Sequence, residues 1–325
     1  MFSSSLLSAF LFGASSITIS IYNKHFLAAF RAPIFLCLAQ TVTILSILSI
    51  LFLLGFRRIH PATFSTSVWT SWSMWGVALS FFAYLFGGVS ALSLLNVTLV
   101  AAIRRLATVF VIILEVWRQR DRVNMEKVTI AFLLLLSIAA AAVTSPTFDM
   151  LGVLLCVMSA FATTFSLLLS KLNQSKLDTI SQLFVTSLMS LPFFVTGLGW
   201  SGEWEYVKGK VEKSGIPLIG GIVVSGILSL SINFASLWCT RTNTPFTTCL
   251  VGITKDVVLY VLAEAVDWAS KSHYSEGREE GVREGLSPAM LMYWSSLFGC
   301  TMLGALLALH PHIQRWRQEK KGKEE

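Results

Sequence analysis

Ten apolar runs, each long enough to cross a lipid bilayer, follow one another along this chain of 325 residues. In the hydrocarbon core every backbone polar group needs an internal hydrogen bond, and a run of about 20 apolar residues meets that need as a helix. The sequence therefore predicts an all-α polytopic membrane protein with ten transmembrane helices. The predicted helices are residues 4–22, 33–55, 68–89, 93–117, 128–146, 150–170, 180–200, 216–239, 246–266 and 287–309.

The composition argues against several classes of function. Charged residues make up 13% of the chain, about half their share in an average soluble domain. The five cysteines show no paired spacing, and no histidine has a carboxylate or cysteine at ligand spacing, so we expect no disulfide, metal or other cofactor. The net charge of +7 is spread over short connecting segments, which argues against nucleic acid as a partner. Without convergent acids and bases, an enzyme is not expected either.

Lysine and arginine are unevenly shared between the two sets of connecting segments. The set that includes the tails holds fourteen of them, and the other set holds eight. Because positive residues concentrate on the cytosolic side of membrane proteins, we expect both termini to be cytosolic. The lipid bilayer is then the first partner of a multi-pass chain.

Two of the predicted helices echo each other. The fourth and the ninth each carry a cation near the middle and a glutamate, Glu115 or Glu264, near the far end. The echo suggests a duplicated unit of five helices, with residues 1–146 as the first repeat, residues 147–310 as the second and residues 311–325 as a basic cytosolic tail. Since five is odd, the second copy would be inverted in the membrane, as alternating access requires.

Lys255 lies near the middle of the ninth predicted helix. A charged side chain at that depth costs roughly 2.5–3.5 kcal/mol on insertion scales, so it is retained where it meets a partner, water or a ligand. Thr248, Gly252 and Lys255 share one helical stripe, and Asp256 follows directly. The stripe predicts access of an anion to the lysine. The structural alternative is a lysine paired with a neighbouring carboxylate for packing alone.

Arg104 and Arg105 place two further cations in the fourth predicted helix, at a depth comparable to that of Lys255. Adjacent residues point about 100° apart on a helix, so we expect one of the two to be structural. Phosphate oxygens suit both the planar fork of arginine and the point charge of lysine. The residues by themselves therefore predict a carrier of organic anions.

Other polar residues within or at the ends of the predicted helices have two interpretations each. Asn23 and Lys24 close the first helix, where Lys24 could bind substrate or reach the lipid headgroups. Gln40 in the second helix could bind a ligand or link helices. The eighth helix carries a patch that would serve a sugar site or helix contacts equally well, and it consists of Ser229, Ser231, Asn233 and Ser236.

Three stretches resemble a known family. They are RRLATVFVIILEVW at 104–117, NTPFTTCLVG at 243–252 followed by ITKD, and Tyr22-Asn23-Lys24 together with Gln40. These stretches are similar to the nucleotide-sugar transporters of the drug/metabolite transporter superfamily. The resemblance implies ten helices in two inverted five-helix repeats, residence in the Golgi or endoplasmic reticulum, and no cofactor. It also implies exchange of a cytosolic nucleotide sugar for a luminal nucleoside monophosphate.

Two segments bear on the substrate. GDP-mannose carriers typically show FYNN in the seventh helix and GALNK in the ninth, whereas this chain has Phe-Val-Thr-Ser at 184–187 and Gly-Ile-Thr-Lys-Asp at 252–256. The ninth helix resembles the UDP-sugar branch more closely, which implies that Gly252 and Lys255 touch the nucleotide and phosphates. The alternatives are a GDP-mannose transporter, a sugar-phosphate or organic-phosphate exchanger, and a non-transporting membrane scaffold.

The tail ends in Lys321-Gly322-Lys323-Glu324-Glu325. Lysines three and five positions from the end resemble a dilysine retrieval signal, which coat proteins read on a cytosolic tail; the alternative is a merely solvated charged tail. We also consider a homodimer as an assembly.

The charge asymmetry yields a test of orientation. In sealed microsomes, external protease is expected to remove a tag at the C-terminus and to spare a tag inserted in residues 201–214. The reverse pattern of protection would show that the chain is inserted the other way round.

Overall fold

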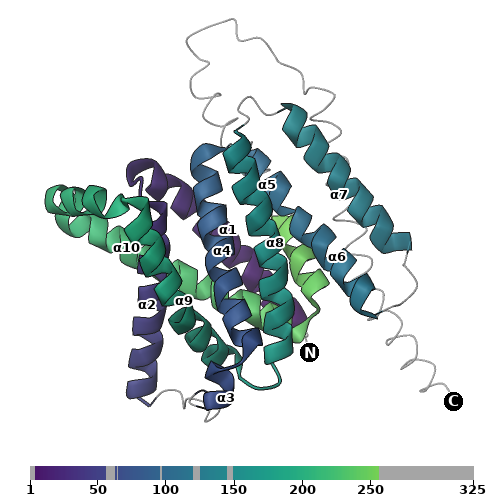
Figure 1. Ribbon diagram of the computed structural model, residues 1–325, viewed down its shortest axis with the longest axis horizontal. Helices are drawn as coiled ribbons and strands as arrows, with labels where there is room; N and C mark the ends of the chain where they lie inside the picture. The colour runs from purple at the N-terminus through teal and green to yellow at the C-terminus, as the bar shows by residue number, and fades with distance from the viewer. Residues whose placement is uncertain are drawn as a thin grey trace, which may run out of the picture.

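The computed structural model describes residues 4–55, 63, 65–95, 97–119, 125–144 and 149–255, and the regular elements in these ranges are helices. They are α1 (Ser4–Ala29), α2 (Pro33–Leu53), α3 (Thr66–Trp69), α4 (Trp72–Leu94), α5 (Val97–Arg104), α6 (Leu106–Gln119), α7 (Met125–Thr144), α8 (Met150–Asn173), α9 (Thr179–Ser201) and α10 (Glu203–Thr242). Residues 245–255 form a further helical segment. Figure 1 shows α7 at one edge of the molecule and the start of α10 at the other.

Six helices among the described residues are long and apolar enough to cross a bilayer. They are Ser4–Leu27, Pro33–Leu53, Trp72–Leu92, Met150–Asn173, Thr179–Ser201 and Leu218–Thr242. The prediction of a helical polytopic membrane protein is thus confirmed. The count of ten stays a prediction, because most of the ninth run and all of the tenth, residues 287–309, lie outside the described residues.

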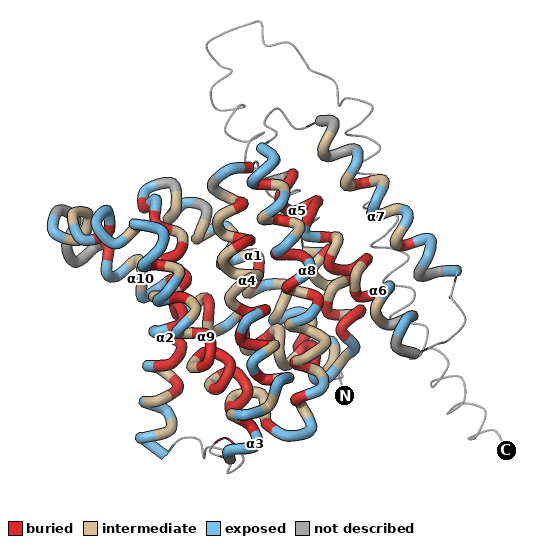
Figure 2. Tube along the Cα trace, viewed as in Figure 1, coloured by how far each residue is buried: buried red, intermediate tan, exposed pale blue. Residues whose placement is uncertain are grey.

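The outward faces of these helices are apolar. Phe10, Met158 and Val195 are all more than half exposed, and a bilayer accounts for such side chains better than water does. Buried residues gather where α2, α4 and α9 meet, whereas exposed residues alternate with buried ones along α7 (Figure 2). The interior of the bundle is therefore where polar side chains need partners.

The fourth predicted helix, residues 93–117, is interrupted at Arg105. The Arg105 N–H donates to the carbonyl of Ala102 at 3.1 Å, and the Thr108 N–H donates to the carbonyl of Arg105 at 2.9 Å. Bonds spanning three residues are typical of a 3₁₀ turn, which divides the run into α5 and α6. The prediction of a single uninterrupted helix for this run is wrong at this point. A pattern of apolar residues does not tell a 3₁₀ turn, with bonds across three residues, from an α-helix, with bonds across four.

The eighth predicted helix, residues 216–239, begins earlier than predicted. α10 starts at Glu203, within a stretch whose lysines and glutamates indicated a connecting segment. Val207 is buried against Phe30 of the α1–α2 turn, and Val211 packs beside it. Residues four apart share one face of a helix, so these two valines pack the first turns of α10 against the end of α1.

Helices from both ends of the chain pack together. α10 packs along α1 and α2, and we call these three helices the α1 group. α8 packs along α4, α5 and α6, and we call these four the α4 group. α9 contacts α2, α4 and α10. Because α10 and α8 come from the second predicted repeat, the two predicted repeats interlock.

Glu203 closes the start of α2 from the neighbouring helix. Its two carboxylate oxygens accept the N–H groups of Ile34 at 3.3 Å and Phe35 at 2.9 Å. The helix has no cap of its own, because Ala32 precedes it and Pro33 occupies the first turn. Burial raises the pKa of the Glu203 carboxyl above its usual range, and the two backbone bonds oppose that shift.

Glu203→Ala should lower the free energy of unfolding by about 1 kcal/mol, the usual loss for a helix cap. A raised pKa means that the folded state binds the proton more tightly, so this group's contribution to stability falls as pH rises from its usual 4.5 through the raised value. Thermal unfolding in detergent should show that fall in the parent and lose it in Glu203→Gln. Glu212→Ala, at an exposed position of α10, is the control; an equal loss there would argue against the cap.

Candidate anion site

The helical segment 245–255 has two different faces. Phe246, Leu250 and Ile253 are buried in a cluster with side chains of α5, α6 and α7. At about 100° per residue these three lie in one sector of the helix. The opposite sector carries the stripe predicted from the sequence, which consists of Thr248, Gly252 and Lys255.

The members of this stripe differ in their surroundings. Thr248 is buried, and its hydroxyl lies 3.2 Å from the carbonyl of Thr244 and 3.6 Å from the sulfur of Cys239. A Cβ added to Gly252 would meet no described atom within 4 Å. Lys255 is half-buried and engages other groups of the protein. Thr248 thus holds the segment to α10, whereas no atom of the described residues crowds Gly252.

The two arginines are clearly separated by burial. Arg105 is 3% exposed, whereas Arg104 is exposed. Arg104 extends past Gly88 of α4, where an added Cβ would lie 3.8 Å from the guanidinium carbon. The nearest atom to that Cβ is the hydroxyl oxygen of Ser159 at 3.1 Å, so glycine makes room chiefly for α8, with Arg104 at ordinary contact distance. The adjacent arginines thus differ in burial, and Arg104 is the accessible one.

Asn23 and Gln40 are brought together by the fold. The amide of Gln40 donates to Ser225 at 2.7 Å and to Asn23 at 3.4 Å, and the Ser225 hydroxyl donates to Asn23 at 2.9 Å. The three residues join α1, α2 and α10, which favours the interpretation of Gln40 as a link between helices. The side chain of Lys24 lies outside the described residues.

A second polar contact joins α4 to α10. The hydroxyl of Tyr84 donates to the carbonyl oxygen of Asn233 at 2.9 Å. The amide nitrogen of Asn233 donates to the carbonyl of Ser229 at 2.8 Å. The sequence singled out Asn233 but not Tyr84, which lies in a run of aromatic residues that reads as lipid-facing. A tyrosine among phenylalanines inside an apolar helix is the only signal that could have marked it.

Asn233 and Lys255 lie at similar distances from one turn of the chain. α10 ends and the 245–255 segment begins at Asn243. With a rise of about 1.5 Å per residue, Asn233 is about 15 Å and Lys255 about 18 Å along the helix axes from this turn. Tyr84 reaches Asn233, and Gly88, beside Arg104, lies one helical turn after Tyr84. Asn233 and Lys255 are thus at similar path lengths from this turn, and Arg104 lies beside a glycine one helical turn from the residue that contacts Asn233.

Another lysine closes the end of α10. The Lys171 ammonium on α8 donates to the carbonyls of Thr240 at 2.8 Å, Arg241 at 3.1 Å and Asn243 at 2.8 Å. A cation at a helix C-terminus satisfies exposed carbonyls and opposes the negative end of the helix dipole. Lys171 therefore has a structural role at the end of α10, away from Asn233.

Some predicted residues have no structural outcome. Asp256, Lys321 and Lys323 lie outside the described residues. Within the described part of the chain, no group of three histidine, cysteine or acidic side chains is arranged to hold a metal ion.

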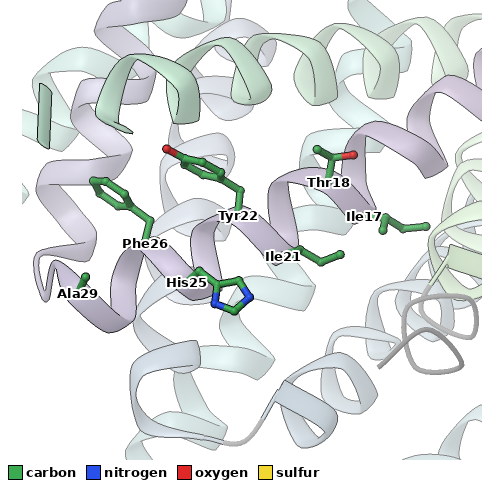
Figure 3. A pocket seen from close by; sticks show the side chains of 7 residues that line it. All are labelled: Ile17, Thr18, Ile21, Tyr22, His25, Phe26 and Ala29. Atoms are coloured by element: carbon green, nitrogen blue, oxygen red, sulfur yellow. The ribbon is translucent and has the colours of Figure 1, made fainter. Parts of the chain in front are cut away.

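One pocket, of about 600 Å³, runs along the surface of α1. All its lining residues come from that helix, and Figure 3 shows Tyr22 and Phe26 pointing toward α10 while His25 points away from it. The pocket contains none of the candidate cations. It is a surface groove of one helix, so the candidate site is defined by Arg104, Lys255 and their neighbours instead.

Three curated proteins of Arabidopsis thaliana are similar in sequence to the chain. The GDP-mannose transporter GONST2 is 27% identical over 260 residues, which are 76% of this chain and 68% of that protein. The UDP-galactose/UDP-glucose transporter 7 is 25% identical over 78% of both chains, and the GDP-mannose transporter GONST1 is 25% identical over 79% of both. The curated relatives are nucleotide-sugar transporters. They support the predicted family without favouring its UDP-sugar branch.

The fold also has a counterpart of known structure. One protein with a crystal structure superimposes with a TM-score of 0.59 at 15% identity, covering 95% of this chain and 98% of its own. At this identity the likeness concerns the fold alone. No protein-family model matches the chain.

The burial of the two arginines predicts different effects on stability. Removing a buried charge that engages other groups typically costs about 3–5 kcal/mol, so Arg105→Ala should strongly lower the thermal unfolding midpoint in detergent. Arg104→Ala should change the free energy of unfolding by no more than about 0.5 kcal/mol, as for other accessible side chains. Equal losses in the two variants would contradict the assignment.

Proposed function

We propose that this chain is an antiporter that brings a nucleotide sugar into the lumen of the Golgi or endoplasmic reticulum in exchange for a nucleoside monophosphate, by alternating access. The observation that carries the proposal is the exposed Arg104, whose guanidinium lies beside Gly88 of the spanning helix α4. The transporter names of the relatives support it. They also agree with the expectation that the chain is not an enzyme.

The chemistry of the cations suits a diphosphate. An accessible arginine inside a membrane bundle is stable where water or an anion reaches it. Arg104 offers two parallel donors to phosphate oxygens, and Lys255 offers a compact charge at a comparable predicted depth in the membrane. In this proposal Gly252 admits the ligand to the stripe, Asp256 follows it, and Thr248 holds the stripe in place. Arg105 supports the turn behind Arg104.

The pattern of helix packing supports two inverted repeats. In two inverted repeats α1 would correspond to α8, α2 to α9, and α4 to α10. Under this correspondence the α1–α10 contact matches the α8–α4 contact, and the α2–α10 contact matches the α9–α4 contact. All four contacts occur. Such an arrangement agrees with repeats at residues 1–146 and 147–310. Alternating access would then follow from two related groups of helices that tilt against each other.

The seventh predicted helix supports a UDP-sugar over GDP-mannose as substrate. Where GDP-mannose carriers have two asparagines, this chain has Thr186 and Ser187, whose hydroxyls are buried without a hydrogen-bond partner in the described residues. A hydroxyl lacks the paired donor and acceptor that an amide presents to a guanine edge. GDP-mannose remains the substrate to compare, because two of the relatives transport it by name.

The cellular setting completes the proposal. Both termini face the cytosol, Lys321 and Lys323 in the tail 311–325 are read by coat proteins, and the carrier needs no cofactor. A second copy of the chain is a candidate partner. The contending functions are exchange of a sugar phosphate or another organic phosphate, and a scaffold that transports nothing.

Reconstituted protein separates these functions. Proteoliposomes loaded with UMP or GMP should take up a UDP-sugar more readily than GDP-mannose, and liposomes loaded with sugar phosphate should not exchange. Preference for GDP-mannose would overturn the assignment of the nucleotide, uptake of sugar phosphates alone would favour the exchanger, and no uptake of any of them would favour the scaffold.

Lys255→Ala tests the site. The loss of a charged hydrogen bond is worth about 1.5–3 kcal/mol, so the affinity for the nucleotide sugar should fall by roughly one to two orders of magnitude. Lys255→Arg should restore part of it, because the fork geometry differs. Lys24→Ala serves as a control near the end of α1. Folded Lys255→Ala protein with parental affinity would remove Lys255 from the site.

A further inference from the structure

The contact between Tyr84 and Asn233 has a fixed polarity. Asn233 is 7% exposed, and its amide nitrogen is occupied by the carbonyl and the hydroxyl of Ser229 at 2.8 and 3.2 Å. Its carbonyl oxygen therefore faces Tyr84, from which it receives a hydrogen bond of 2.9 Å. Since the nitrogen is held on α10, Asn233 presents an acceptor to whatever stands in the place of the tyrosine hydroxyl.

This bond connects helices that belong to different groups. Of the described helices, α4 packs on α2, α3, α5, α8 and α9, and α10 packs on α1, α2, α8 and α9. The two helices share no extended packing, so two side chains span the separation between them. Tyr84 is held from behind, because Ser159 of α8 donates to its backbone carbonyl at 2.8 Å. This bond, which we call the Tyr84–Asn233 bridge, therefore joins the α1 group to the α4 group, one helical turn along α4 from the glycine beside Arg104.

Arg104 stands next to the bridge on the same face of α4. Tyr84 and Gly88 are four residues apart and share that face, and the guanidinium lies against Gly88. An anion bound to Arg104 would thus place its attached groups within reach of a phenol hydroxyl and a carboxamide oxygen. The carboxamide oxygen of Asn233 is an acceptor, to which an ionised phosphate oxygen has no proton to donate, so the pair favours ligand groups that carry a proton, such as hydroxyl and amide groups.

We propose that Tyr84 and Asn233 are the specificity-determining contacts for the uncharged part of the substrate, whose hydroxyl or amide groups take the place of the hydrogen bond between the two side chains. The inference rests on the proposed function and assigns two more residues to its site. Substrate hydroxyl or amide groups replace the bond with bonds of the same kind, so the exchange is close to balanced in free energy. Arg104 and Lys255 hold the phosphates, and the bridge selects what is attached to them.

The test compares ligands with and without an uncharged part. Uptake of a nucleotide sugar into proteoliposomes is inhibited with unlabelled nucleotide sugar, with nucleoside monophosphate and with inorganic pyrophosphate. Tyr84→Phe and Asn233→Ala should each weaken inhibition by nucleotide sugar about 3- to 10-fold, the effect of one neutral hydrogen bond, and should leave inhibition by pyrophosphate unchanged. Arg104→Ala should weaken inhibition by all three ligands.

The outcomes separate the possibilities. If Tyr84→Phe weakens inhibition by nucleoside monophosphate as well, the contact is with the base or ribose. If it weakens inhibition by the nucleotide sugar alone, the contact is with the hexose. Tyr206→Phe is the matched control, since its hydroxyl accepts the N–H of Arg31 at 3.3 Å, at the end of the bundle. Thermal unfolding that falls in Tyr84→Phe while all affinities stay parental would overturn the inference, and parental protein without any nucleotide-sugar uptake would overturn the proposed function first.

Discussion

A cation at membrane depth is stable only where protein groups or water surround it, and the packing around α4, α5 and α8 meets that requirement in two ways. Arg105 is enclosed at the turn between α5 and α6. Arg104, its neighbour, is exposed and lies beside Gly88. The 3₁₀ turn therefore lies where a buried charge and an exposed charge are adjacent in the chain.

Many hydroxyl groups inside the spanning helices of the described residues donate to the backbone of their own helix. Thr41, Thr43 and Ser46 of α2 each donate to the carbonyl four residues earlier, at 2.8–2.9 Å. Such bonds satisfy a serine or threonine in an apolar helix without a partner on another helix. Polar contacts between spanning helices carry more information, because each one fixes the position of two helices. The Gln40 cluster and the Tyr84–Asn233 bridge are contacts of this kind.

The sequence predicted the helices well and the contacts between them poorly. Apolar length alone located the six spans of the described residues, because the bilayer imposes the same length on any sequence. The stripe of Thr248, Gly252 and Lys255 followed from helical periodicity. Tyr84 could not be found in this way, since its role depends on α10, about 150 residues away. The break at Arg105 was missed for a similar reason: an apolar run does not reveal where a buried charge tightens the backbone.

The interlocked packing also bears on how the chain is made. Ser225 and Asn23, whose side chains bind each other, are 202 residues apart in sequence. At about 5–20 residues per second, synthesis needs roughly 10–40 s to produce the second partner after the first. During that time the polar groups of α1 and α2 enter the membrane without α10. Insertion factors that shelter them until α10 arrives would therefore matter more for this chain than for a bundle whose neighbours follow one another in sequence.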